Sequence, residues 1–481
     1  MNKFNRRSFI KKSALGAAAV SFSARSWSQV EGSNSDVRFA VIGFNGRGGD
    51  HMKEIAKVSG ARLTALCDAD ENVLTRGVAQ LRKDGKEVEQ FKDMRKLLES
   101  KNIDAISIAT PNHWHSLAAI WAIQAGKDVY VEKPVCHNVF EGRQLVNFAR
   151  AHKKIVQTGT QCRSSSGIRE AVEWVQQGNL GKILVARGLC YKRRPSIGKV
   201  NGPQPIPEGI DYDLWCGPAP MEPLMRKRLH YDWHWVWPTG NGDLGNQGIH
   251  QMDIARWFLG EMELAPRVFS VGGRLGYIDD GTTPNTQIVF HDYKKAPLIF
   301  EVRGLPAGEG RNEMDKLKGA SVGNIIECEN GYVVVPNYTG ATAYDKEGNK
   351  VKEFKGSESH HGNFVKAVHS RQSKDLNADI LEGHLSSSLC HTGNISYRLG
   401  HKVRPQEMRE AIKGDRGASE TFDRMAAHLE ANGVDITKDQ LALGAPLKMD
   451  PKTEKFIGNK QADALLTREY RQPYVVPEKV V

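Results

Sequence analysis

Cysteine is scarce in this sequence, with seven residues among 481, and none of them forms a Cys-x-x-Cys pair. Because the seven are scattered and odd in number, we expect neither a disulfide framework nor a structural zinc site. Long apolar runs are also absent: no stretch reaches the roughly 18 residues that a membrane-spanning helix requires. We therefore expect no metal, and no membrane partner once the N-terminal leader described below has been removed.

More than half of the surplus positive charge lies at the start of the chain. The formal net charge is +11, and residues 1–28 hold six basic residues and no acidic ones. Beyond residue 28 the two signs are interspersed and form no basic stripe, so nucleic acid is not an expected partner. Hydrophobic residues make up 40% and charged residues 26% of the chain, which is typical of globular proteins. The length suffices for two or three domains.

The N-terminus has the layout of an export signal. Arg6 and Arg7 precede the apolar stretch "ALGAAAVSF", and Ser26 and Ser28 suit a cleavage site before Gln29. This order predicts a twin-arginine signal peptide over residues 1–28 and a periplasmic protein. Twin-arginine export carries folded proteins, which suits a protein that acquires its cofactor in the cytoplasm. A basic N-terminal extension without a targeting role is the alternative.

Residues 36–158 alternate between apolar runs and helical patterns. "VRFAVIGF" reads as a strand buried on both faces, and a glycine-rich turn, a helix and a second strand ending at Asp68 follow it. Further strand and helix patterns continue to residue 158 and predict a doubly wound parallel sheet of the Rossmann type. Asp68 lies 20 residues after Gly48, where such a unit places the carboxylate that binds the adenosine ribose. We therefore expect NAD in preference to NADP, although Arg47 could compensate for a 2′-phosphate.

The glycine-rich turn departs from the G-x-G-x-x-G fingerprint at its middle position, where Asn45 replaces glycine. Gly43 is expected to make the tight turn, Gly48 to let the helix approach the strand, and Gly46 to keep the loop compact. Asparagine tolerates unusual backbone angles better than most residues. We therefore expect the turn to keep its pyrophosphate-binding role.

A more specific pattern is "ATPNHWHSLAAIWAIQAGKDVYVEKP", residues 109–134. It resembles the Gfo/Idh/MocA family of oxidoreductases, whose pattern here is T-P-x-x-x-H, then A-G-K, a strand and E-K-P. The resemblance spans about residues 36–400 and is nearest to the exported sugar oxidoreductases of the glucose-fructose oxidoreductase type. With the ribose and turn residues above, it implies that the cofactor site consists of Gly43, Asn45, Gly46, Arg47, Gly48, Asp68, Thr110, Pro111, Asn112, His115 and Glu132.

Lys133 stands at the end of a predicted parallel strand, at the carboxyl edge where open α/β sheets bind ligands. A lysine beside a nicotinamide cation faces a like charge, which lowers its pKa and prepares it for proton transfer. The family motif makes Lys133 an expected catalytic residue. Taken alone, it also reads as a solvated loop lysine with Glu132 as its surface partner.

Residues 159–400 read as a second, α+β domain. A helix is followed by strand-like stretches that are spaced as in an antiparallel sheet. The family's second domain is an open, mostly antiparallel sheet that is often used for oligomerisation, so the resemblance implies a homo-oligomer, a dimer or a tetramer. Residues 401–481 are punctuated by proline and glycine, and we interpret them as a wrapping tail.

The stretch "YDWHWVWPTGNGDLGNQGIHQMDIARW", residues 231–257, aligns with the family's D-x-G-x-H motif. The resemblance places Asn246 at the aspartate and makes His250 the acceptor of the substrate's hydroxyl proton, with Lys133 orienting or sharing that proton. Asparagine cannot ionise, so Asn246 is expected to orient the substrate without relaying a proton. Asp243 or Asp253 could supply the missing carboxylate; we favour Asp243 because Asp253 is expected to point into helix packing.

Three tryptophans, Trp233, Trp235 and Trp237, alternate along the same stretch. In a strand they would line one face, and aromatic faces suit the C–H surfaces of sugars. We take Trp235 as the expected substrate contact, with a core or interface role equally open. The histidines nearby, His230 and His234, have no acidic motif beside them, so we expect no metal there.

These observations predict an exported NAD(H)-dependent oxidoreductase that acts on a hydroxyl or keto group of a sugar or glycoside. Soluble NAD is scarce outside the cytoplasm, so the cofactor is expected to stay tightly bound. Two alternatives remain. One is an NAD-dependent glycosidase or lyase that oxidises C3 transiently and eliminates a substituent, and the other is a sugar-binding protein without activity.

Overall fold

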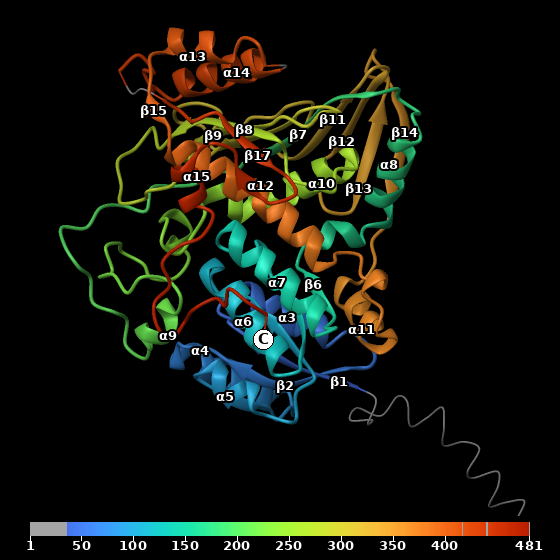
Figure 1. The fold of residues 1–481 in the computed structure, drawn as a ribbon, viewed down its shortest axis with the longest axis vertical. Coiled ribbons are helices and arrows are strands. Elements are labelled where there is room, and N and C mark those ends of the chain that lie inside the picture. The colour runs from blue at the N-terminus through green and yellow to red at the C-terminus, as the bar shows by residue number, and fades with distance from the viewer. Residues whose placement is uncertain (1–35, 416, 439–440, 481) are drawn as a thin grey trace, which may run out of the picture.

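The computed structural model describes residues 36–415, 417–438 and 441–480, so the predicted signal peptide lies outside the described residues. Two sheets organise this part of the chain, a parallel one near the N-terminus and a larger mixed one (Figure 1). Among the described residues, no helix combines the length and the apolar character needed to cross a membrane.

The first sheet has six strands in the order β3-β2-β1-β4-β5-β6, and all of its pairs are parallel. This confirms the predicted doubly wound sheet, in which helices pack on both faces. The strands are β1 (Val37–Ile42), β2 (Ala61–Cys67), β3 (Glu89–Phe91), β4 (Ala105–Ile108), β5 (Asp128–Val131) and β6 (Val156–Thr158). The helices are α3 (Arg47–Ile55), α4 (Glu71–Lys83), α5 (Met94–Leu98), α6 (His115–Gln124) and α7 (Val139–Ala151), with short 3₁₀ helices at Asn112–Trp114 and Gln161–Ser164.

The second sheet contains twelve strands, and β10 with β7 is its parallel pair among otherwise antiparallel ones. The predicted mostly antiparallel second sheet is therefore confirmed. Its strands are β7 (Ile183–Tyr191), β8 (Arg267–Gly273), β9 (Thr286–His291), β10 (Leu298–Arg303), β11 (Val322–Cys328), β12 (Gly331–Val335), β13 (Gly340–Tyr344), β14 (Lys350–Lys355), β15 (His401–Lys402), β16 (Ala442–Leu443), β17 (Leu447–Asp450) and β18 (Lys455–Phe456).

One face of this sheet packs on helices to form the largest core cluster. Apolar side chains of α8 (Ser166–Gln176), α10 (Ile249–Leu259) and α12 (Ile380–Arg398) meet strand residues such as Phe300 and Val289 there. The remaining helical segments are α9 (Tyr212–Cys216), α11 (His360–Ser370), α15 (Lys460–Ala464), two 3₁₀ helices at Asp232–Trp235 and Ser373–Asp375, and a π-helix at Leu244–Gly248.

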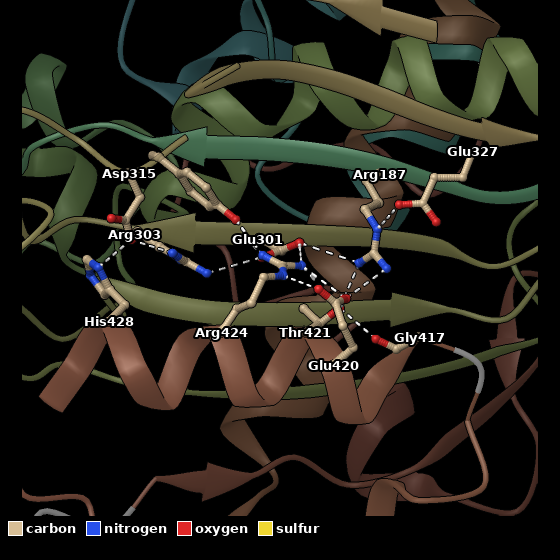
Figure 2. Close-up of polar contacts among 11 residues, drawn as sticks. Arg187, Glu301, Arg303, Asp315, Glu327, Gly417, Glu420, Thr421, Arg424 and His428 are labelled. Atoms are coloured by element: carbon tan, nitrogen blue, oxygen red, sulfur yellow. Dashed lines mark hydrogen bonds and ion pairs between the residues drawn. The ribbon is translucent and has the colours of Figure 1, made fainter. Parts of the chain in front are cut away.

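The opposite face is covered by α13 (Pro405–Ile412) and α14 (Ala418–Ala431), through apolar contacts that include Phe290 and Phe422. Figure 2 shows the polar part of this contact, in which Arg424 points from α14 toward Glu301 on β10. The guanidinium nitrogens lie 2.7 and 2.8 Å from the two carboxylate oxygens. Burial opposes the charge on Glu301, but Arg424 and its neighbouring arginines lower the pKa of this carboxyl below its ordinary value. The segment after residue 400 is thus fixed to the sheet by ion pairs as well as by packing.

A long connection between β7 and α10 crosses to the parallel sheet. It meets the end of β2 through a bridge between Asp70 and Ile210 and through His230, whose Nε2 lies 3.0 Å from an Asp70 carboxylate oxygen. The C-terminal residues hold its other side, where the Tyr474 hydroxyl donates to Asp213 at 2.7 Å. This crossing connection closes over the carboxyl edge of the parallel strands.

Candidate active site

A cavity of about 420 Å³ lies at the carboxyl edge of the parallel sheet, beneath the crossing connection. Most residues expected from the sequence line it, namely Gly43, Asn45, Gly46, Arg47, Asp68, Thr110, Pro111, Asn112, His115, Glu132, Lys133 and Asn246. The crossing connection adds Leu214, Trp215, His230, Tyr231, Trp233 and His234. Gly48, Asp243, Trp235 and His250 are not among the lining residues.

The glycine-rich turn is shaped by two glycines. Gly43 has φ +76°, and a Cβ added to it would lie 2.9 Å from the backbone of Thr110. A Cβ on Gly48 would lie 2.1 Å from the carbonyl oxygen of Gly43, so α3 can approach β1 this closely only with glycine there. Asn45 is not among the residues with positive φ, and its side-chain oxygen accepts a hydrogen bond from Arg76. The positive φ of the turn lies at Gly43, so the tolerance of asparagine for unusual backbone angles is not used at position 45.

Asp68 lies at the other end of the turn. One carboxylate oxygen accepts from the Phe44 amide at 3.1 Å, and the other accepts from the Asp70 amide at 3.0 Å. Burial raises the pKa of Asp68 above its ordinary value, and these backbone donors oppose that rise. Asp68 and His230 line this end of the cavity, and Asp70 lies behind them with its carboxylate held by the first turn of α4 and by His230.

Glu132 is the centre of a buried polar cluster behind the cavity. One of its oxygens lies 3.0 Å from Nε of Arg47 and 3.0 Å from Nε2 of His51. Burial opposes its charge, but these partners lower the pKa of the carboxyl well below the ordinary range. His51, on α3, was missed from the sequence; its only signal was a polar residue three positions after Gly48. The cluster joins α3, the helix after the glycine-rich turn, to the end of β5, which Lys133 follows.

His115 ties two loops of the site together. Its ring nitrogens lie 2.6 Å from the carbonyl oxygen of Pro134 and 2.7 Å from that of Thr110. Burial lowers the pKa of the imidazole. Since both nitrogens face main chain, His115 is engaged in structure, in agreement with its expected place near the cofactor and away from the proton-transfer step.

Lys133 crosses from the parallel sheet to the second domain. Its Nζ donates to the backbone oxygen of Asn246, 2.6 Å away, on the π-helix that precedes α10. Burial lowers the pKa of this ammonium, and the Glu132 carboxylate opposes the shift. The structure thus brings together Lys133 and Asn246, which are 113 residues apart.

His250 lies in the first turn of α10, with its ring centroid 5.1 Å from that of Tyr338. Burial and the nearby Lys133 ammonium lower the pKa of the imidazole to about 3, so the ring is neutral. Its buried Nδ1 has no hydrogen-bond partner in the described part of the chain. Tyr338 is a further residue that the sequence did not reveal, because it comes from the β12–β13 turn.

Asp243 and Trp235 do not occupy the substrate positions expected of them. Asp243 is buried in an ion pair with Arg194, with nitrogen–oxygen distances from 2.6 to 3.1 Å. Trp235 is buried beneath the same guanidinium, 5.0 Å from its ring centroid. Trp233 and Trp235 lie in a 3₁₀ helix and Trp237 lies in the turn after it, so alternation does not place the three on one face. Trp233 lines the cavity instead. Asp253 pairs with Arg163 inside the helix packing, as expected.

Two family models match this chain. The model described as an oxidoreductase family with an NAD-binding Rossmann fold covers residues 37–160, and that of the family's C-terminal alpha/beta domain covers residues 169–427. The chain belongs to the Gfo/Idh/MocA family of oxidoreductases. Its first domain is therefore an NAD-binding domain, and NAD is its cofactor. The glycine cradle at positions 43 and 48 fits this nucleotide, because only a backbone without Cβ atoms leaves the turn this close to the strand end.

Curated relatives match part of the chain. An inositol 2-dehydrogenase/D-chiro-inositol 3-dehydrogenase of Halalkalibacterium halodurans is 30% identical over 165 residues, which cover 34% of this chain and 46% of that protein. A glycosyl hydrolase family 109 protein of Solibacter usitatus is 32% identical over 167 residues, covering 32% and 38%. The matches thus span less than half the length of these relatives.

Solved structures share the fold. Levoglucosan dehydrogenase in complex with NADH and levoglucosan has a TM-score of 0.56 at 17% identity, covering 74% of this chain and 95% of that one. The WlbA dehydrogenase from Bordetella pertussis, in complex with NADH and UDP-GlcNAcA, has a TM-score of 0.54 at 20% identity, covering 74% and 94%.

Proposed function

We propose that this protein is an exported oxidoreductase that carries NAD(H) and acts on a hydroxyl or keto group of a sugar or glycoside. The observation that carries the proposal is the placement of Lys133, at the end of β5 in the nucleotide cavity, against the π-helix that leads to His250. NAD, when bound, accepts a hydride from a carbinol carbon and can return it.

Proton transfer falls to the chain's own residues. Lys133, whose ammonium is destabilised by burial, takes the hydroxyl proton as the carbon is oxidised and returns it on reduction. Neutral His250 is the second acceptor in this proposal, and its buried Nδ1 has no hydrogen-bond partner among the described residues. Asn246 holds Lys133 through its backbone and offers its amide side chain to the substrate.

Tight retention of the cofactor is part of the proposal. A twin-arginine leader would deliver the folded protein to the periplasm, where released NADH could not be recycled readily. The crossing connection supports retention, because it covers the cavity and is fixed both to the end of β2 and to the C-terminal residues. Asp68 and Asp70 favour NAD over NADP by repelling a 2′-phosphate.

Transient oxidation, as in an NAD-dependent glycosidase or lyase, is the second candidate. It is favoured by the relatives named glycosyl hydrolase family 109 proteins and by a bound cofactor that is restored in each cycle.

A spectroscopic experiment tests both candidates. The mature protein is dialysed extensively, and its near-ultraviolet NADH band is followed while inositols, free sugars and methyl glycosides are added. We expect a band that rises with one class of sugar and no added NAD. A protein that never forms NADH with any sugar, even with NAD supplied, would refute the proposed function.

A further inference from the structure

His234 places a third proton-transfer group in the same cavity. It lies in the 3₁₀ helix Asp232–Trp235 and lines the cavity together with Lys133 and Asn246. Burial lowers the pKa of its imidazole to about 3, with the Lys133 ammonium among the charges that contribute, so this ring is neutral too. Lys133 therefore lies within electrostatic reach of two neutral imidazoles, His250 and His234.

The tautomer of His234 follows from its contacts. Its Nδ1 donates to the carbonyl oxygen of Tyr231, which can only accept. The neutral ring therefore carries its lone pair on Nε2, which no hydrogen bond from the described residues occupies. The ring also stacks on Trp233, with centroids 3.6 Å apart and planes inclined by 20°. An imidazole with one nitrogen engaged and the other free is oriented as a proton acceptor.

The backbone around His234 is built for this position. Tyr231 has φ +63°, an uncommon left-handed conformation for a bulky residue, and it is the residue whose carbonyl receives Nδ1. On the other side, a Cβ on Gly240 would lie 2.4 Å from the carbonyl oxygens of both Trp233 and His234. Backbone strain of this kind is concentrated at functional sites.

We propose that His234 is a second catalytic base, which removes a proton from the carbon next to the one that is oxidised. The inference rests on the proposed function, since oxidation must come first to make that C–H bond acidic. In the step, the C–H bond breaks, its proton moves to Nε2, and its electron pair shifts toward the new carbonyl oxygen to form an enolate. The enolate charge faces the Lys133 ammonium, and the reverse step returns the proton to carbon.

Oxidation of a hydroxyl group releases one proton, and Lys133 and His250 already provide acceptors for it. Removal of a proton from the neighbouring carbon is a separate step that requires a base of its own, and we assign this step to His234. The substrate class is therefore a sugar or glycoside with a hydrogen on the carbon beside the oxidised carbinol.

Deuterium exchange tests this step. The dialysed protein with its cofactor is incubated in D₂O with methyl glycosides of the gluco, galacto and N-acetylgalactosamine series, and C–H exchange is followed by proton NMR. NADH formation on mixing is measured in parallel by absorbance. His234→Asn removes the acceptor, and His369→Asn, on an exposed position of α11, is the matched control.

We expect the wild type and His369→Asn to exchange deuterium at one carbon beside the oxidised position. His234→Asn should exchange deuterium at least about 100-fold more slowly for the same amount of NADH formed, the usual effect of losing a general base. Exchange that persists in His234→Asn, or a wild type that forms NADH without exchange, would overturn the inference. Loss of both NADH formation and exchange in a variant that still holds the nucleotide would place His234 in the hydroxyl step instead. A wild type that forms no NADH with any glycoside would contradict the proposed function itself.

Discussion

The Nζ atom of Lys133 lies 2.6 Å from the backbone oxygen of Asn246, so the lysine at the end of β5 meets a neutral carbonyl. The family pattern has an aspartate at position 246, and a carboxylate there would stabilise the ammonium. A carbonyl accepts a hydrogen bond but carries no charge, which leaves burial to lower the pKa of Lys133. Asparagine in place of the aspartate should therefore leave more of the lysine as the free amine, which is the form that can accept a proton.

Removal of the lysine amine should abolish turnover and spare the fold. Lys133→Ala is expected to lower kcat by about 100- to 10,000-fold, since loss of a general base usually costs that much. The nucleotide should remain bound, because its cradle consists of backbone at Gly43 and Gly48. Steady-state kinetics and the absorbance of bound nucleotide measure the two effects; near-normal turnover would remove Lys133 from the mechanism.

A charge introduced at position 246 should move the pH profile. Asn246→Asp places a carboxylate near Lys133, which favours the ammonium and raises its pKa. Because the free amine is the active form, the limb of kcat that rises with pH should shift to higher pH. Asn246→Ala keeps the backbone oxygen and should leave that limb in place. The profiles of the three proteins decide this, and an Asp variant with an unshifted limb would show that Lys133 does not limit the reaction.

Asp243 is expected to matter for stability and not for proton transfer. Asp243→Asn leaves the Arg194 guanidinium buried without its charge partner, which typically costs about 3–5 kcal/mol in the free energy of unfolding. Denaturant unfolding of the nucleotide-loaded protein measures this loss. The double variant Arg194→Met/Asp243→Leu should recover part of it. A stable Asp243→Asn protein with a strongly reduced kcat would restore Asp243 to the catalytic site.

The parallel sheet and its cofactor edge were predictable because their signals are local. The glycine turn, the strand before it and Asp68 lie within a single βαβ unit, and "EKP" marks the end of a strand. The partners of Asp243 and Trp235 were not predictable in this way. Both contact Arg194, which is 49 residues from Asp243 in the sequence and lies beside it only after the crossing connection has folded.

His234 and Asn246 show a second limit. The alternation of tryptophans suggested a strand, whereas the chain forms a 3₁₀ helix that turns His234 into the cavity. The sequence predicts that the side chain of Asn246 orients the substrate, but it does not predict the contact that the backbone oxygen of Asn246 makes with Lys133. The type of a residue predicts the chemistry of its side chain. It does not predict which backbone carbonyl oxygen of a loop is free to accept a hydrogen bond.

Asp68 should control the choice between the two nucleotides. Asp68→Asn removes the charge that repels a 2′-phosphate and keeps an oxygen for the Phe44 amide. The ratio of the Kd values for NADP and NAD should fall by about tenfold, equivalent to about 1.4 kcal/mol. Calorimetric titration of the nucleotide-free protein measures both constants. Equal Kd values for NAD and NADP in the wild type would rule out this role for the carboxylate.

Retention of the cofactor should depend on the contacts that fix the crossing connection. Trp215 and His230 of the crossing connection line one side of the nucleotide cavity, so we expect a bound nucleotide to leave faster when this connection is loosened. Tyr474 and Arg471 hold it at Asp213, and the Tyr474 hydroxyl donates to that carboxylate at 2.7 Å.

A hydrogen bond to a charged group contributes about 1.5–3 kcal/mol, and the lower end applies because Asp213 is half-exposed. Tyr474→Phe should therefore speed the dissociation of NAD by about tenfold, since changes of this kind fall mainly on the dissociation rate.

Tyr344→Phe, on β13 of the second sheet, is the matched control. The nucleotide remaining after timed dialysis is released by heat and assayed. Wild-type and Tyr344→Phe proteins should keep NAD and turn over sugar without added cofactor, while Tyr474→Phe should lose both until NAD is supplied. A wild type that emerges free of nucleotide and consumes added NAD in proportion to product would show that this is an ordinary dehydrogenase with an exchanging cofactor.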